Sequence, residues 1–322
     1  MKFSVLGCGR WGSFITWYLA NTGHSVLEWG RPESRAFSEL KQNRENEYVK
    51  LDDKVILSSD LSEAVNFADA IIISIKSQGL RELARRAAKF GAGNKHVILC
   101  MKGLEEDTGL RLTEIMQSEG YDPNMLAVWV GPGHIQEFTA GKANCMVIDG
   151  YNRELVTHLV DTLKSSLIRF YYGDDIIGSE IGAAAKNVMG IAAGVLDGAD
   201  MQTLKGPLMA RGAREVSRLI KALGGNELSA YGLCHLGDYE TTLFSKHSHN
   251  RKYGESLARG VHFDKLAEGV YTARAMKLLG EKYGVDLPIT TAVYNVIYEK
   301  RPPVEEISLL FDRRTVTEFY TK

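Results

Sequence analysis

Short apolar runs alternate with amphipathic segments along the first half of this chain. Runs of β-branched and other apolar residues predict strands, and apolar residues that recur every three or four positions predict helices. The runs predict strands over 1–6, 24–29, 55–57, 70–75, 96–101, 125–130, 143–149 and 167–172. The intervening segments predict helices over 11–21, 36–54, 60–67, 80–90, 110–120 and 153–165. Strands that alternate with helices in this way are typical of a parallel sheet with helices on its faces.

The second half of the chain predicts helices alone. A helix of very small residues covers 176–198, which implies tight packing on several sides, and further helices are predicted over 207–223, 263–284 and 290–299. The polar run from Gly237 to Arg251 is either a plain loop or a segment that wraps a phosphate and a polyol. We therefore predict an α/β N-terminal Rossmann-type dinucleotide-binding domain over residues 1–176, followed by an all-α C-terminal domain over residues 177–322.

The turn after the first strand carries a G-x-G-x-x-G motif between a strand and a helix. In this context the first glycine permits a tight turn, the second lets the backbone approach a pyrophosphate, and the third lets helix and strand pack closely. The start of the helix supplies an anion site. An ordinary glycine turn is the alternative, which the flanking elements disfavour. The predicted cofactor-binding residues here are Gly7, Cys8, Gly9, Arg10, Trp11 and Gly12.

The end of the second strand bears on the choice between NAD and NADP. An acidic residue there would bind a ribose 2′-hydroxyl, whereas an arginine would accommodate a 2′-phosphate. Glu28 falls inside the strand, just before Trp29, so Arg31 is better placed and NADP is preferred over NAD. A solvated loop arginine is the alternative. Lys76 and Ser77 follow another apolar strand and are predicted to border the cofactor, because ligands of such sheets bind beyond the carboxyl ends of strands.

Two lysines are candidates for acid–base and electrostatic roles. Lys102 follows a strand and precedes Gly103, so it could reach an anionic substrate or a developing oxyanion, although such a lysine alone is more often solvated. Lys186 is the only cation in the helix of small residues. Partial burial would lower its pKa from about 10.4 towards the range useful for proton transfer. Extension of the ammonium into solvent is the alternative, and the sequence leaves both open.

Composition favours a cytoplasmic protein with a small partner. The 322 residues are 44% hydrophobic and carry a net charge of −1, which provides no general attraction for nucleic acid or an anionic membrane. The four cysteines lie far apart, which argues against a zinc site or a disulfide framework and fits a reducing compartment. The chain starts on a strand rather than a leader, and no apolar run reaches membrane-spanning length. We therefore expect no metal, nucleic-acid or membrane partner.

Further motifs follow one another along nearly the whole chain. They are Lys102-Gly103-Leu104-Glu105, Gly131-Pro132, Ile181-Gly182-Ala183-Ala184-Ala185-Lys186-Asn187, Asp197-Gly198, Arg211-Gly212, Leu236-Gly237-Asp238, Asn250-Arg251 and Glu268-Gly269. In this order and spacing the chain resembles the soluble NAD(P)-dependent glycerol-3-phosphate dehydrogenases. The resemblance implies a homodimer that interconverts dihydroxyacetone phosphate and sn-glycerol 3-phosphate, and that supplies the latter for phospholipid synthesis.

The resemblance and the placement of residues together predict a role for each site residue. Lys186 would donate and accept the proton, with Lys102 as its electrostatic companion. Asp238 would orient Lys186 or a hydroxyl, and Thr242 would support the site. The predicted substrate contacts are Lys102, Gly131, Gly133, Lys186, Asn187, Asp238, Ser248, His249, Asn250 and Arg251. The predicted cofactor contacts beyond the glycine loop are Trp29, Arg31, Tyr48, Lys76, Ser77, Lys102, Ile135, His249, Leu266 and Glu268.

Three positions depart from the family pattern. The usual Ser-Arg-Asn reads Ser-His-Asn here, so His249 places a weaker, titratable cation where an arginine helps to bind substrate phosphate and cofactor. Arg251 is the candidate to compensate. The loop usually written Gly-Pro-Ser/Thr-Phe-Ala reads Gly-Pro-Gly-His-Ile, which loses a hydroxyl contact at Gly133. Lys50 stands where a proline is usual, two residues after Tyr48.

Two other functions stay open on the sequence alone. A reductase of the same fold would use NAD(P)H to reduce another polar or phosphorylated ketone, as the departures at Gly133 and His249 suggest. A non-enzymatic protein would use the cofactor fold to sense redox state, although retention of both Lys102 and Lys186 disfavours it. Oxidation of NAD(P)H by dihydroxyacetone phosphate would discriminate among the three.

Overall fold

The computed structural model describes residues 1–318 and places an eight-stranded sheet in the N-terminal part of the chain. Its order is β3-β2-β1-β4-β5-β6-β7-β8. Every neighbouring pair is parallel except β6 and β7. The order reverses between β1 and β4, and open α/β sheets bind ligands at such a switch point. The strands are β1 (Lys2–Leu6), β2 (Ser25–Trp29), β3 (Ile56–Ser58), β4 (Ala70–Ile73), β5 (His96–Leu99), β6 (Leu126–Val130), β7 (Asn144–Gly150) and β8 (Ile168–Tyr172).

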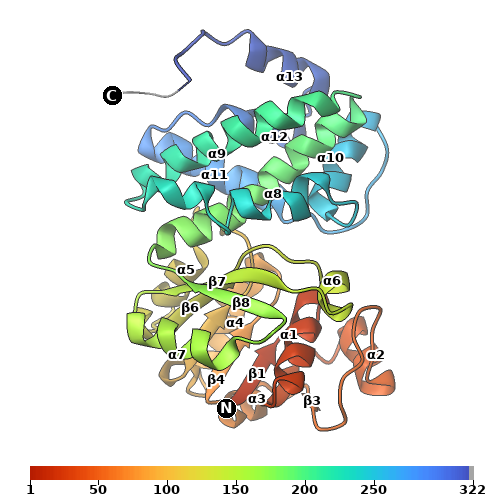
Figure 1. The fold of residues 1–322 in the computed structure, drawn as a ribbon, viewed down its shortest axis with the longest axis vertical. Coiled ribbons are helices and arrows are strands. Elements are labelled where there is room, and N and C mark those ends of the chain that lie inside the picture. The colour runs from red at the N-terminus through yellow and green to blue at the C-terminus, as the bar shows by residue number, and fades with distance from the viewer. Residues whose placement is uncertain (319–322) are drawn as a thin grey trace.

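Helices cover both faces of the sheet (Figure 1). They are α1 (Arg10–Asn21), α3 (Leu61–Phe67), α4 (Leu80–Ala88), α5 (Leu112–Ser118), α6 (Ile135–Thr139) and α7 (Arg153–Leu163), with α2 (Arg35–Asn43) following β2. One apolar layer packs α1, α6 and α7 against strand residues such as Phe3 and Val5. The opposite layer packs α3, α4 and α5 against residues such as Ile71 and Ile73. Central strands buried on both faces need the continuous apolar runs that the sequence shows.

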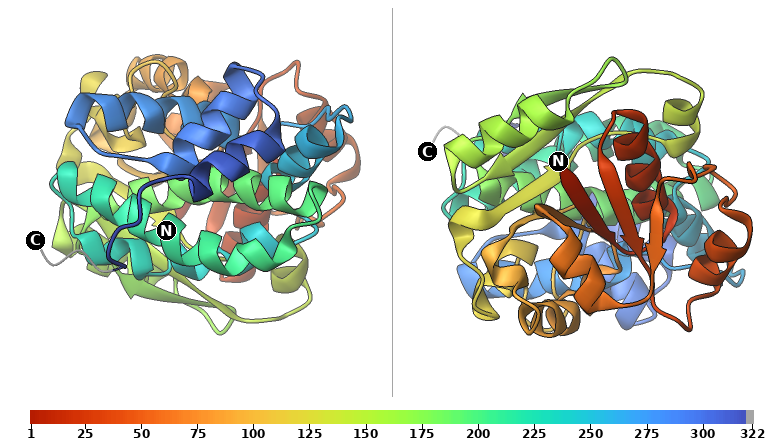
Figure 2. Two further views of the ribbon diagram at one scale, coloured as in Figure 1. Left: turned by 90° about the horizontal axis from the view of Figure 1, so that it is seen from above. Right: turned by 90° about the horizontal axis from the view of Figure 1, so that it is seen from below.

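The C-terminal part of the described chain is helical. Its α-helices are α8 (Ile176–Gly198), α9 (Lys205–Ala222), α10 (His249–Arg259), α11 (Gly269–Tyr283), α12 (Pro288–Tyr298) and α13 (Pro303–Phe311). They stack on one end of the sheet domain, so that each domain occupies one end of the molecule (Figures 1 and 2). This arrangement confirms the predicted fold class. The predicted division after residue 176 stays a prediction, and it falls in the first turn of α8.

No helix in the described part of the chain is long and apolar enough to cross a membrane.

Several predicted helix boundaries were wrong. The helix predicted over 36–54 ends at Asn43, after which the polar residues form a loop. The helix predicted from 263 begins at Gly269. Helix α10 lies partly in the predicted polar run, and its buried positions are Gly254 and Ser256, which give no apolar periodicity to detect.

Helix α8 packs closely against α10 because both carry glycine at the contact. A Cβ on Gly194 would lie 1.8 Å from the carbonyl oxygen of Arg251, and a Cβ on Gly254 would lie 2.0 Å from that of Ile191. Nearly every residue of α8 is buried, as its small side chains predicted. The contact therefore fixes the start of α10 against the middle of α8.

We expect Gly194→Ala to destabilise the protein by about 1–3 kcal/mol, because the new methyl group meets a backbone carbonyl that cannot move without separating the two helices. Gly206→Ala is the matched control, since a Cβ at this exposed position of α9 meets no described atom within 4 Å. Its stability should be unchanged or raised. Urea unfolding measures both, and equal unfolding midpoints for the two variants would contradict the packing account.

Candidate active site

A cavity of about 910 Å³ opens where the strands end and the helical domain begins. The loops after β1, β2, β4 and β5 line one side, and residues of α8 and α10 line the other. This is the edge at which open α/β sheets bind ligands. The predicted site residues in its lining are Gly7, Cys8, Gly9, Arg10, Trp11, Trp29, Arg31, Lys76, Lys102, Gly133, Ile135, Lys186, Asn187, Thr242, Ser248, His249, Asn250, Leu266 and Glu268.

The rest of the predicted set lies outside this lining. These residues are Gly12, Tyr48, Ser77, Gly131, Asp238 and Arg251. Ser77 donates a hydrogen bond to Glu268 and so supports a residue of the lining. Arg251 is not brought into the cavity, because its guanidinium donates to Asp197 and, at 3.1 Å, to the carbonyl oxygen of Ser245. Its charge is balanced there by Asp197 and Glu255.

The glycine loop is shaped to admit a dinucleotide. Gly7 has a φ of 122°, and a Cβ there would lie 2.2 Å from the carbonyl oxygen of Ser74. A Cβ on Gly12 would lie 1.8 Å from the carbonyl oxygen of Gly7, where α1 meets β1. A Cβ on Gly9, by contrast, would meet no described atom within 4 Å, and no described side chain caps α1. Open space beside uncapped backbone N–H groups fits a pyrophosphate.

Glu28 and Arg31, the two candidates to contact the cofactor ribose, lie in different environments near the end of β2. Glu28 lies inside the strand as predicted, fully buried, and accepts a hydrogen bond of 2.9 Å from Oγ of Ser13. Burial raises the pKa of Glu28 to about 8. Arg31 lies in the loop beyond, lines the cavity, and has a side chain that is 65% exposed, 3.7 Å from Glu33. Arg31 is therefore better placed than Glu28 to meet the ribose of a bound dinucleotide.

Two lysines from different domains converge on one buried carboxylate. The ammonium of Lys186 lies 2.6 Å from Oδ2 of Asp238, and that of Lys102 lies 2.7 Å from the same oxygen. Lys186 also donates to Oγ1 of Thr242 at 3.0 Å, and Lys102 to the carbonyl oxygen of Gly131 at 2.6 Å. Asp238 is 0% exposed and the Lys186 side chain only 9% exposed. The site thus holds two cations against one anion.

Burial decides how these groups ionise. It lowers the pKa of Lys186 to about 7, with Asp238 opposing the shift and Lys102 adding to it. Burial alone would raise the pKa of Asp238, but the two lysines keep it below its usual value. Lys186 is buried rather than extended into solvent, so it can exchange a proton near neutral pH while Asp238 stays ionised.

A chain of amide groups connects Lys102 to the helical domain. Nδ2 of Asn187 donates to the carbonyl oxygen of Lys102 at 2.8 Å, and Nδ2 of Asn250 donates to Oδ1 of Asn187 at 2.9 Å. The N–H of Gly269 donates to Oδ1 of Asn250 at 2.9 Å. This series of hydrogen bonds connects the loop after β5 with α8, α10 and the start of α11. It therefore fixes the position of Lys102 relative to Lys186.

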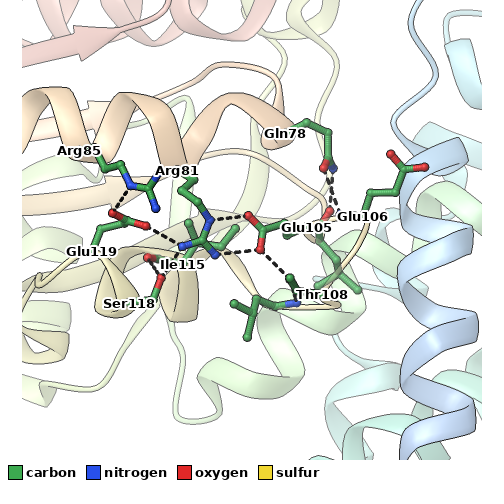
Figure 3. A network of polar contacts seen from close by, with 11 residues as sticks. Gln78, Arg81, Arg85, Glu105, Glu106, Thr108, Ile115, Ser118 and Glu119 are labelled. Atoms are coloured by element: carbon green, nitrogen blue, oxygen red, sulfur yellow. Dashed lines mark hydrogen bonds and ion pairs between the residues drawn. The ribbon is translucent and has the colours of Figure 1, made fainter.

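The loop that carries Lys102 is also anchored on its far side (Figure 3). Arg81 of α4 makes two hydrogen bonds of 2.8 Å to the carboxylate of Glu105 and one of 2.6 Å to Glu119. Gln78 donates to the loop backbone at 2.8 Å. A bidentate arginine–carboxylate pair fixes orientation as well as distance, so the loop is held in one geometry from both sides.

Sequence reasoning missed two histidines and a threonine at this site. The rings of His134 and His247 meet edge to face in the cavity lining, with centroids 5.7 Å apart. Thr241 donates to the shared carboxylate on the side opposite the lysines. Gly133 has no room for a larger residue, because a Cβ would lie 2.4 Å from the ring of Phe138. The glycine-rich loop after β6 could have indicated that His134 belongs to the site. No local sequence pattern relates His134 to His247.

A dinucleotide-binding loop that faces a buried, ionisable lysine is the arrangement of a nicotinamide-dependent dehydrogenase. Residues 2–156 match the family model described as the N-terminus of NAD-dependent glycerol-3-phosphate dehydrogenase, and residues 175–308 match that of its C-terminus. The chain belongs to this family.

Full-length relatives and solved structures agree with this assignment. The glycerol-3-phosphate dehydrogenase (NAD(P)+) of Prosthecochloris aestuarii is 34% identical over 97% of this chain and 98% of its own, and that of Fusobacterium nucleatum is 33% identical over 97% of each. The structure of glycerol-3-phosphate dehydrogenase from Coxiella burnetii superposes with a TM-score of 0.90 at 26% identity, over 97% of this chain and 99% of its own. A ketopantoate reductase from Ralstonia eutropha, with a TM-score of 0.63 and 18% identity over 95% of this chain and 100% of its own, shares the fold alone.

We expect Lys186 to titrate near neutral pH and its two neighbours to move its pKa in opposite directions. Asp238→Asn removes the anion that favours the ammonium, so the pKa of Lys186 should fall. Lys102→Met removes the repelling cation, so the pKa of Lys186 should rise. Each of the two changes in pKa should be about one pH unit or more. Trace reductive methylation at a series of pH values, with the Lys186 peptide quantified by mass spectrometry, follows the neutral amine without requiring turnover. The exposed Lys89 serves as the reference for reagent reactivity, and a common midpoint in all three proteins would contradict the coupling.

Proposed function

We propose that this protein interconverts dihydroxyacetone phosphate and sn-glycerol 3-phosphate with NAD or NADP. Family membership and the names of its full-length relatives support the reaction. The observation that carries the chemistry is the buried Lys186, which shares the carboxylate of Asp238 with Lys102 beside the dinucleotide cavity.

Lys186 acts on the substrate oxygen. During ketone reduction its ammonium donates a proton to the carbonyl oxygen as negative charge develops there, and during alcohol oxidation its neutral amine accepts that proton. A bound nicotinamide cofactor would supply or accept the hydride at the adjacent carbon. Because the pKa of Lys186 is about 7, both forms of the lysine are available at neutral pH.

The groups around Lys186 stabilise charge and hold the two lysines in position. Lys102 keeps a second positive charge beside the substrate oxygen and stabilises the developing oxyanion. Asp238 and Thr242 orient the Lys186 ammonium, because each accepts one of its hydrogen bonds. Asn187, hydrogen-bonded to the backbone of Lys102, holds that lysine in place.

The substrate and the cofactor would share one cavity, with the reacting carbon of the substrate beside the nicotinamide. Ser248 and Asn250 at the start of α10 would meet the substrate, and the glycine loop would meet the pyrophosphate. We further propose, from the family resemblance, that the protein acts as a homodimer in the cytoplasm and provides glycerol phosphate for phospholipid synthesis.

Steady-state assays with NADH and NADPH against a panel of phosphorylated and unphosphorylated ketones test the proposed function. We expect dihydroxyacetone phosphate to be the best substrate and sn-glycerol 3-phosphate to be the product. Preferential reduction of another ketone would favour the alternative reductase of the same fold.

Lys186→Ala should lower kcat by about 10²–10⁴-fold while leaving the cofactor Kd, measured by fluorescence titration, near the wild-type value. Near-wild-type turnover by Lys186→Ala would remove this lysine from the mechanism.

Arg31→Ala should weaken NADPH binding about tenfold and leave NADH binding unchanged, since NADPH alone carries a 2′-phosphate for the guanidinium to bind. Fluorescence titration of both cofactors measures the ratio of Kd values. Arg35→Ala is the control, because Arg35 lies four residues along, pairs with Glu39 and is outside the cavity lining. Equal losses of both cofactors in Arg31→Ala would show that Arg31 does not read the 2′ position.

A further inference from the structure

The guanidinium of Arg10 reaches from the glycine loop to the helical domain. Its Nη1 lies 3.3 Å from Nε2 of His249, the residue that stands where the family pattern has an arginine. The same guanidinium lies over the ring of Tyr48, 5.2 Å from the ring centroid. Arg10 and His249 both line the cavity. These contacts hold a permanent positive charge at the junction of the two domains.

The hydrogen bond to Arg10 defines the protonation of His249. A guanidinium only donates hydrogen bonds, so Nε2 of His249 must accept and carries no proton. The remaining proton is on Nδ1, where the backbone of Leu266 accepts it. Burial and the charge of Arg10 both lower the pKa of His249, in agreement with a neutral ring. A neutral His249 cannot supply the charge that an arginine would provide.

One donor of Arg10 is not used by the described residues. Its Nε is buried and has no hydrogen-bond partner among the described residues. A buried donor without an acceptor is costly, and a ligand that brings an acceptor removes the cost. Arginine donors match the paired oxygens of a phosphoryl group. The other arginine near this end of α10, Arg251, already pairs with Asp197 and Glu255.

We infer that Arg10 binds the phosphate of the substrate and that His249 is a positioning residue that holds Arg10 for this purpose. The position favours the substrate phosphate over the cofactor pyrophosphate, because His249 lies between Ser248 and Asn250 at the start of α10, and Asn250 donates to Asn187 beside Lys186. The charge that the family pattern places on α10 is thus delivered from the opposite domain. The identity of the substrate rests on the proposed function.

Comparison of dihydroxyacetone phosphate with dihydroxyacetone, at saturating NADPH, isolates the phosphate contact. Arg10→Ala should lower kcat/KM for the phosphorylated ketone by about 10- to 100-fold more than it lowers kcat/KM for dihydroxyacetone, mainly through KM. Arg35→Ala, an exposed arginine outside the cavity, should change neither. Calorimetric titration of the NADPH complex with inorganic phosphate should show the same loss of affinity in Arg10→Ala without depending on turnover.

Variants at His249 test its positioning role. His249→Leu should reproduce part of the Arg10→Ala defect on the phosphorylated ketone. His249→Gln retains a hydrogen-bond acceptor and should therefore keep most of the wild-type kcat/KM for that ketone. Introducing His249→Arg into Arg10→Ala should recover the preference for the phosphorylated ketone, because the charge then comes from α10 again.

Three results would overturn the inference. They are equal losses on both ketones in Arg10→Ala, a weaker NADPH complex with an unchanged ratio between the ketones, and phosphate affinity that does not depend on Arg10. A wild-type protein that reduces no phosphorylated ketone would refute the proposed function instead, and the phosphate titration would still decide the role of Arg10.

Discussion

The carboxylate of Asp238 accepts hydrogen bonds from two lysines, and the chemistry of the site depends on this imbalance of charge. A single buried anion cannot fully stabilise one buried and one partly buried cation, because both cations lose solvation. Lys186 is the more buried of the two and responds by a lowered pKa. The excess positive charge faces the cavity, where an anionic substrate or a developing oxyanion would neutralise it.

This shared ion pair also makes the site a property of two domains. Lys102 comes from the sheet domain, whereas Lys186 and Asp238 come from the helical domain. Two sets of contacts keep them together: the amide chain through Asn187 and Asn250, and the arginine–carboxylate network on the loop after β5. The same apposition places Arg10 of one domain against His249 of the other. Loosening the interface would therefore alter proton transfer and substrate binding together.

The sequence predicted what depends on local pattern. Parallel strands, the helices between them and the glycine loop were recognisable because their periodicity and turn chemistry are local, and so was the position of Glu28 inside β2. Whether Lys186 is buried could not be predicted, because that depends on how α8 packs. The pairing of Arg251 with Asp197 and of His134 with His247 joins residues distant in the chain. Such contacts leave no periodic trace, since they depend on tertiary structure alone.

The pH dependence of kcat/KM, measured in both directions of the reaction, tests the role of the shared ion pair most directly. If Lys186 is the acid in reduction and the base in oxidation, reduction should fall and oxidation should rise as the pH increases through a common midpoint near 7. Titration of the phosphate, near a pH of about 6, acts on phosphorylated substrate in each direction and cannot produce opposite slopes. Profiles that change in the same direction, or that lack a common midpoint, would contradict acid–base catalysis by Lys186.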